Sequence, residues 1–168
     1  MSENSGLFAM ADVSAKSVTT RRALAAGEIV LGAKAFDLVV QRQLPKGDAL
    51  VLAEIAGIQG AKQTPSLIPL CHPINLNRVI VRHHPVPERH AVAVYCLAEI
   101  AERTGVEMEA LTGASIALLT LWDLAKPIEA TLEIQAVTLR YKSGGKSGEW
   151  IHPDGLEPFA KEMIGLTP

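Results

Sequence analysis

Asp123 and Lys126 are the two side chains of this 168-residue chain whose types and spacing best suit acid–base chemistry. Residues three apart on a helix are neighbours, and helical periodicity puts this pair on a stripe with Glu109, Thr112 and Thr120. The stripe is poor in the long charged side chains of a solvated helix face. In a partly dry site, burial and the partner's charge would shift both pKa values and divide acid and base roles. A solvent-facing stripe is the competing interpretation, in which the pair contributes only about 0.2–0.5 kcal/mol.

The loop at residues 142–148, with the sequence KSGGKSG, has the composition of an anion-binding turn. Its glycines let backbone amides turn toward an anion, and Lys142 and Lys146 add positive charge for phosphate oxygens. It is not a P-loop, because Arg140 stands where the first glycine of that motif belongs. Lys46, directly before an expected helix start, adds charge where free amides already favour an anion. A flexible basic turn and a solvated lysine are the alternatives for these two features.

The segment at residues 69–73, with the sequence PLCHP, holds Cys71 and His72 in a stiff turn, because its two prolines restrict the backbone on either side. A lone histidine is more often structural than catalytic. The only other cysteine lies 25 residues further on, which favours neither a disulfide framework nor a zinc site. His83 and His84 would face opposite sides of a strand, so we assign them no role and expect no metal site.

Local signals place the elements that would carry these residues. Asp48 has the character of a helix N-cap, and Thr104 with Glu107 has the spacing of a capping box that opens a long helix. Pro127 would end that helix. Residues 21–31 fit either a strand or a helix start. The other expected elements are a short helix at 32–44, a helix at 49–63, strands at 78–86 and 90–101 joined by a hairpin loop, a long helix at 104–126 and a strand at 131–141.

This order contains a split β-α-β-β-α-β unit. The sequence therefore predicts an α+β fold, a ferredoxin-like antiparallel sheet with helices packed on one face. We expect a loose N-terminal arm at 1–15, a single catalytic domain at 16–150 and a C-terminal tail at 151–168, because no linker divides the chain.

The composition is that of an ordinary soluble globular protein, with 48% apolar and 20% charged residues. A net charge of −2 and only 4% aromatic residues argue against a nucleic-acid partner. The longest apolar stretch, around 114–122, is shorter than the roughly 20 residues of a membrane span, and no secretory signal is apparent. We therefore expect a cytoplasmic protein with reduced thiols and no membrane partner.

Several stretches, in one order, resemble the molybdenum cofactor biosynthesis protein C family, which is also called cyclic pyranopterin monophosphate synthase. The resemblance covers residues 11–148, and the combination of motifs makes it specific, whereas the glycine-rich loop alone would be a weak signal. The stretches that carry it are DVSAK at 12–16 with Arg21, KGDAL at 46–50, AGIQGAK at 56–62, LIPLCHP at 67–73, TGVEMEALT at 104–112, DLAK at 123–126 and KSGGKSG at 142–148.

The resemblance implies a lyase that converts 3′,8-cyclo-7,8-dihydro-GTP, made by an upstream radical enzyme, into cyclic pyranopterin monophosphate with release of pyrophosphate. Such a reaction needs proton transfers and anion stabilisation, so no cofactor is required. The sequence does not reveal whether Mg²⁺ accompanies the triphosphate. Carried over by motif, Asp123, Lys126 and Lys46 are the catalytic residues, and Lys46 and Lys142 hold the triphosphate region. The implied substrate-binding residues are Arg21, Leu70, Cys71, His72, Met108, Glu109 and Lys142.

The length of the expected helix restricts how the site is built. If the helix is continuous, Glu109 and Asp123 are about 21 Å apart along its axis, at about 1.5 Å per residue. A small substrate does not easily reach both within one subunit, so we expect a site assembled between chains. The family resemblance agrees, since it implies a homohexamer, a trimer of dimers with inter-subunit sites. Pro127 departs from the family pattern and is expected to end the helix sooner and to tilt Lys126.

Two alternatives to an enzyme remain open on the sequence. One is a non-catalytic binding domain that uses the loop at 142–148 to hold a nucleotide or a partner's phosphate. The other is an inactive assembly subunit of the cofactor pathway, which is disfavoured because all the catalytic-type residues are in place. Replacement of Asp123 separates an enzyme from a binding domain, because only the enzyme would lose turnover while it still binds substrate.

Overall fold

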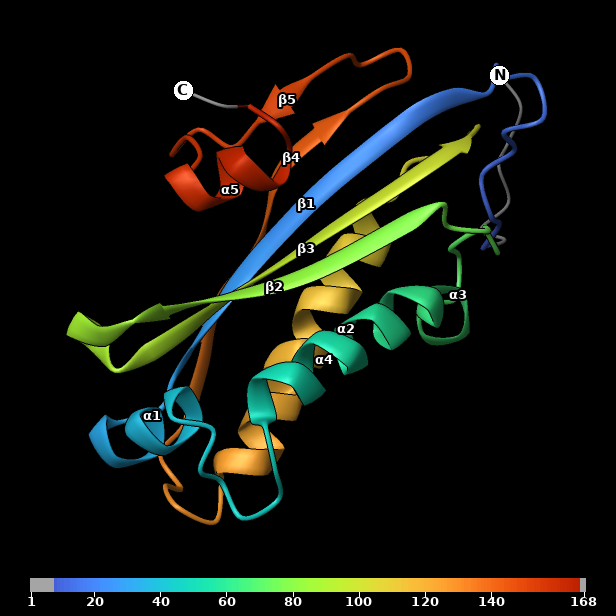
Figure 1. Cartoon of the computed structure of the whole chain (residues 1–168). Coiled ribbons are helices and arrows are strands. Elements are labelled where there is room, and N and C mark those ends of the chain that lie inside the picture. Colours follow the sequence, from blue (N-terminus) through green and yellow to red (C-terminus); the bar gives the residue numbers. More distant parts are fainter. Residues whose placement is uncertain (1–7, 167–168) are drawn as a thin grey trace.

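Five strands form one open antiparallel sheet in the computed structural model, which describes residues 8–166 (Figure 1). The strand order is β2-β3-β1-β4-β5, and each neighbouring pair is antiparallel. Without β5 this is the order of the split β-α-β-β-α-β unit, so the prediction of an α+β fold is confirmed. The strands are β1 (Thr19–Val30), β2 (Arg78–Val86), β3 (Ala91–Glu102), β4 (Glu133–Ser143) and β5 (Trp150–Ile151).

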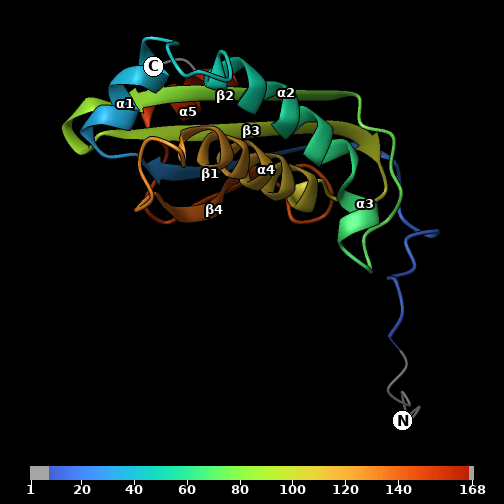
Figure 2. The same ribbon diagram turned by 90° about the horizontal axis from the view of Figure 1, so that it is seen from below.

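Two long helices, α2 (Ala49–Lys62) and α4 (Glu107–Ala125), lie side by side on one face of the sheet (Figure 2). Glycines allow this close approach. A Cβ atom at Gly57 would lie 2.9 Å from the carbonyl oxygen of Gly113, and one at Gly113 would lie 2.5 Å from Sγ of Cys96. The main apolar core fills the space between these helices and the sheet. The shorter helical segments are α1 (Ala33–Val40), α3 (Thr64–Leu67), η1 (Pro87–Arg89) and α5 (Pro158–Met163).

The C-terminal residues form regular structure that the sequence does not predict. Helix α5 lies on the face of the sheet opposite to α2 and α4, and Ala160 and Ile164 are buried there against Leu24, Tyr95 and Tyr141. A helix this short is stabilised by tertiary packing rather than by its own periodicity, so no pattern in the sequence announces it. The expected tail at 151–168 is therefore, over its described residues, a packed part of the fold.

Of the two predicted helix starts, the one at Asp48 is confirmed and the one at Thr104 is not. Asp48 caps α2 as expected, since its Oδ1 accepts hydrogen bonds from the amides of Leu50 and Val51 at 3.1 and 3.2 Å. The capping box at Thr104 is wrong: α4 begins at Glu107, Val106 occupies the N-cap position, and no side chain caps it. The Glu107 carboxylate instead accepts from Lys142 Nζ at 3.2 Å, because β4 brings a cation to this helix end. The strand alternative for residues 21–31 is confirmed by β1.

Helix α4 is long and apolar enough, by length and composition, to cross a membrane. This differs from the expectation drawn from the shorter apolar stretch. Half of this stretch is buried inside the fold, against the sheet and α2, as in the core helix of a soluble protein. The helix is therefore only weak evidence for a membrane.

Candidate active site

Asp123, Lys126 and Lys46 meet at the C-terminal end of α4, and we call them the Asp123 cluster. Lys126 Nζ donates a hydrogen bond of 2.6 Å to Asp123 Oδ1. Lys46, from the turn before α2, places its Nζ 3.7 Å from Asp123 Oδ2. One carboxylate thus lies between two ammonium groups that are 80 residues apart in the chain, as expected for the three implied catalytic residues. Lys46 and Lys142, which were expected to hold the triphosphate region together, lie at opposite ends of α4, because Lys142 pairs with Glu107 at the helix start.

The electrostatics of this cluster differ from the partly dry pair expected. The hydrogen bond from Lys126, then the charges of Lys126 and Lys46, lower the pKa of Asp123 below its usual value of 3.8. The Asp123 side chain is 53% exposed, so within one chain the carboxylate is ionised and solvated. A dry environment for the pair requires a further surface over it.

The tilt of Lys126 that Pro127 was expected to cause is absent. Helix α4 ends at Ala125, yet Lys126 keeps helical backbone angles (φ −52°, ψ −28°) and its amide donates to the carbonyl of Trp122 at 2.9 Å. Its Nζ also lies 5.9 Å from the centroid of the Trp122 ring. Proline lacks its own amide hydrogen and disfavours, without forbidding, the α conformation of the residue before it, so Lys126 can still complete the last helical turn.

A second set of predicted residues gathers at the N-terminal end of α4, and we call it the Glu109 group: Leu70, Cys71, His72, Met108 and Glu109. Glu109 is only 3% exposed, and burial raises the pKa of its carboxyl group. Helix α3, directly before the turn at 69–73, packs against α4. Burial, and then the nearby charge of Glu109, raise the pKa of the Cys71 thiol. Leu70 and Met108 are 48% and 38% exposed. His72 Nε2 lies 2.8 Å from the carbonyl oxygen of Ala11.

The remaining predicted residues, Arg21 and Lys142, lie at the same end of α4. Arg21 lines a cavity of about 270 Å³, here called the anion cavity, which Lys16 and Lys146 also line; no acidic side chain of residues 8–166 lines it. A smaller adjoining cavity is lined by both Arg21 and Lys142. Sequence reasoning gave Lys16 no role. The only signal for Lys16 in the sequence is its place in the family-like motif at 12–16. The segment before β1 and the glycine-rich loop are far apart in the sequence and come together only in the folded chain.

The histidines that were assigned no role lie as expected on opposite faces of the sheet. His83 Nδ1 lies 2.8 Å from Glu54 Oε1 on α2, whereas the ring of His84 lies 5.2 Å from that of Phe159 on α5. Among residues 8–166, no three or more histidine, cysteine, aspartate or glutamate side chains gather in a way that would hold a metal ion.

Burial of Glu109 leads to a pH-dependent prediction. A carboxyl group whose pKa is raised by folding favours the folded state while it is protonated, and this stability is lost as the pH rises through its folded-state pKa. Glu109→Gln should therefore melt at a higher temperature than the wild type at pH 7–8, and the two proteins should converge below the ordinary glutamate pKa of 4.5. Melting curves across this range test it, with the exposed Glu133→Gln as control. A difference that does not depend on pH would contradict the explanation.

The fold and these groups define a ferredoxin-like α+β protein with cationic side chains at both ends of its longest helix. The model of the MoaC family matches residues 10–145, so the chain belongs to this family. The chain is 44% identical over 144 residues to a cyclic pyranopterin monophosphate synthase of Chloroflexus aurantiacus, covering 86% of this chain and 88% of that protein. It is 43% identical over 148 residues to the protein of that name from Rhodospirillum rubrum, covering 88% and 89%. A mitochondrial protein of that name from Arabidopsis thaliana is 49% identical over 141 residues, 84% of this chain and 52% of that protein.

Proposed function

We propose that this chain is a cyclic pyranopterin monophosphate synthase, the name that its relatives carry, and acts in molybdenum cofactor biosynthesis. As a lyase of the cytoplasm, it would convert 3′,8-cyclo-7,8-dihydro-GTP, supplied by an upstream radical enzyme, into cyclic pyranopterin monophosphate and pyrophosphate. The observation that carries the proposal is the Asp123 carboxylate between the ammonium groups of Lys126 and Lys46.

The Asp123 cluster suits the proton transfers of this reaction. The base is rebuilt into a pterin and a cyclic phosphate closes, so protons must leave and enter the substrate. Asp123 is held ionised by its lysine neighbours and is therefore able to accept a proton. Lys126, hydrogen-bonded to the same carboxylate, is placed to donate one, and Lys46 balances the charge.

The anion cavity suits the departure of pyrophosphate. Negative charge grows on the leaving group, and fixed cations near it lower the barrier. In the proposal, Arg21 and Lys142 hold the triphosphate together with Lys16 and Lys146, and the Glu109 group lines the place of the ring system. No redox cofactor is required, since the reaction as written exchanges protons and a phosphate bond rather than electrons.

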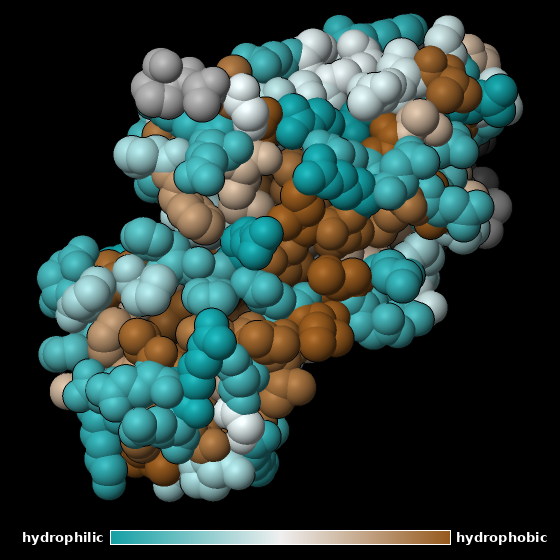
Figure 3. All heavy atoms as spheres, viewed as in Figure 1, coloured by the Kyte–Doolittle hydropathy of each residue, from teal (hydrophilic) through white to brown (hydrophobic). Residues whose placement is uncertain are grey.

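We further propose that each active site is shared by two chains of a homohexamer, a trimer of dimers. Helix α4 is continuous, so Glu109 and Asp123 are about 21 Å apart along its axis, too far for one small substrate. Apolar surface is available for association: Figure 3 shows apolar residues gathered along the middle of one face of the molecule. Ile55 on α2 and Leu119 on α4 are 59% and 54% exposed. Exposed apolar patches of this kind mark protein interfaces, and a neighbouring chain would also cover Asp123.

Incubation of the purified protein with cyclic dihydro-GTP tests the proposed function. We expect pyrophosphate and cyclic pyranopterin monophosphate to appear in equal amounts, with no cofactor added. A parallel reaction with EDTA decides whether Mg²⁺ accompanies the triphosphate. A protein that binds this substrate but forms neither product would be the binding domain of the alternative hypothesis, and the proposal would be wrong.

A further inference from the structure

The C-terminal residues 149–166 lie beyond the region that the family model matches, which ends at residue 145. They form β5 and α5 and pack beside the glycine-rich loop at 142–148. We propose that this segment, called here the C-terminal brace, positions the loop against Arg21, and that Arg140 and Arg22 anchor it as positioning residues. The inference rests on the proposed function for the role of the loop in holding the triphosphate.

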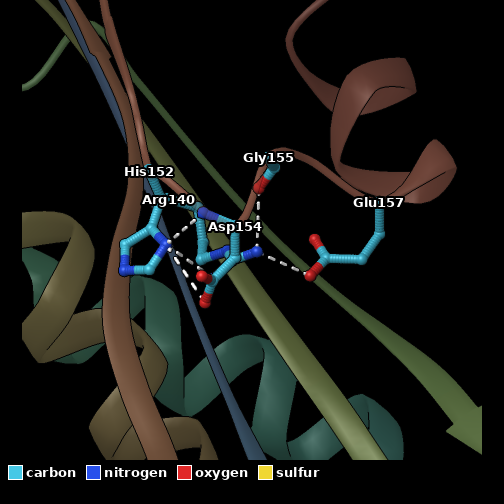
Figure 4. Close-up of polar contacts among 5 residues, drawn as sticks. All are labelled: Arg140, His152, Asp154, Gly155 and Glu157. Atoms are coloured by element: carbon cyan, nitrogen blue, oxygen red, sulfur yellow. Dashed lines mark hydrogen bonds and ion pairs between the residues drawn. The ribbon is translucent and has the colours of Figure 1, made fainter.

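Arg140 is the first anchor. It lies on β4, two residues before Lys142, and is only 9% exposed. Its Nη2 donates to the carbonyl of Gly155 at 2.9 Å and to Glu157 Oε1 at 2.8 Å, and its Nη1 lies 3.4 Å from His152 Nδ1 (Figure 4). Its buried Nε has no partner among the described residues, so the contacts of the two Nη atoms are the ones that hold this guanidinium. Burying a guanidinium is costly unless it is paired, and these contacts therefore fix the turn between β5 and α5 to β4.

Backbone pairing closes the loop at the same place. Tyr141 is paired with Ile151 and Lys142 with Trp150, and the amide of His152 donates to the carbonyl of Arg140 at 2.9 Å. The loop between β4 and β5 is therefore held at both ends by strand pairing. A two-residue strand is weak by itself, which is why its hold depends on the side-chain anchor behind it.

Arg22 is the second anchor, and it is the chain neighbour of Arg21. Its Nη1 donates to the carbonyl of Ile164 at the end of α5 at 3.0 Å, and its Nε donates to Glu99 Oε1 at 2.8 Å. Arg22 also lines the small cavity that contains Arg21 and Lys142. The C-terminal brace is thus held at two places. Arg140, two residues before Lys142, binds the turn before α5, and Arg22, next to Arg21, binds the residue after α5.

The loop itself fits tightly on Arg21. Gly144 and Gly145 have left-handed φ angles of 99° and 69°, which favour glycine. A Cβ atom at Gly145 would lie 2.5 Å from Arg21 Nη1, and one at Gly144 would overlap the carbonyl oxygen of Thr20. Any shift of the loop would therefore change the walls of the anion cavity directly.

Glu157→Gln tests the brace in the full chain, because it weakens one partner of Arg140 at a half-exposed side chain and should leave the fold intact. Hydrogen exchange at the base of the loop is the first measurement: we expect the amides of the β4–β5 pairing, and that of His152, which donates to Arg140, to exchange about tenfold faster, with α4 amides unchanged. Affinity for inorganic pyrophosphate should fall about fivefold, and KM for cyclic dihydro-GTP should rise about as much with kcat within about twofold, because the chemical groups are untouched. Arg140→Lys should act in the same direction, since an ammonium group has no fork to hold two partners.

Glu162→Gln within α5 is the control, because it makes the same chemical change five residues after Glu157, the N-cap of this helix, and makes no hydrogen bond or ion pair with Arg140 among the described residues. The proposal is overturned if Glu157→Gln behaves like this control in exchange at the base of the loop and in pyrophosphate affinity. It is also overturned if exchange rises equally throughout the chain, since that would be general destabilisation. Exchange and pyrophosphate binding do not need turnover, so they decide on the brace even if the wild-type protein forms no product and the proposed function fails.

Discussion

Asp123→Asn is expected to lower kcat by about 10³-fold while the affinity for cyclic dihydro-GTP stays nearly unchanged, because general acid–base groups typically contribute about 10²–10⁴-fold. Asparagine has the same shape as aspartate but cannot accept the proton. It also removes the negative charge that Lys126 and Lys46 share. Single-turnover rates and equilibrium binding of the substrate measure the two effects separately.

The melting temperature should change little, because Asp123 is half-exposed and its lysine neighbours can turn to water. Asp37→Asn, at an exposed position on α1, is the control for loss of a carboxylate and should keep full activity. Equal rates for Asp123→Asn and the wild type would remove Asp123 from the chemistry. A loss of binding without a loss of kcat would make it a substrate-binding residue only.

Mixed oligomers of Asp123→Asn and Lys142→Ala give the second prediction. Each variant alone should be nearly inactive, because each lacks one half of every site. In a dimer that contains one chain of each kind, one of the two shared sites would have both intact halves. Random mixing should therefore restore about a quarter of the wild-type activity.

Co-expression of the two variants with different affinity tags supplies the mixed assemblies, and each variant purified alone is the control. A site contained within one chain would show no recovery above the average of the two parents. That result would also show that the 21 Å separation along α4 had been bridged within the chain, at about 1.5 Å per residue.

Features that depend on residues close together in the sequence were predictable. Asp48 starts α2 because its side chain serves amides two and three residues away, and the hairpin between β2 and β3 follows from the prolines of its loop. The long helix was predicted from the capping-box spacing at Thr104 and from Pro127 after its end, and its length then led to the expectation of a site that one chain cannot complete. The grouping of Lys46 with Asp123 was implied only by the family resemblance.

Features that depend on distant segments were not predictable. Glu107 has the spacing of a capping box but pairs with Lys142, which no local pattern reveals. Helix α5 is stabilised by packing on an apolar face of the sheet and by the pairing of Arg140 with Glu157 at its N-cap. Both interactions form only in the folded chain. The exposure of Asp123 likewise depends on what surrounds the helix end, which the spacing of Asp123 and Lys126 does not specify.

A crystal structure of Asp123→Asn with intact cyclic dihydro-GTP bound is the most direct test of the shared site. The proposal predicts the triphosphate against Arg21 and Lys142 of one chain, and the ring system within hydrogen-bond reach of Lys126 of a second chain. A substrate held at both ends by residues of a single chain, or a triphosphate bound away from Arg21 and Lys142, would contradict it.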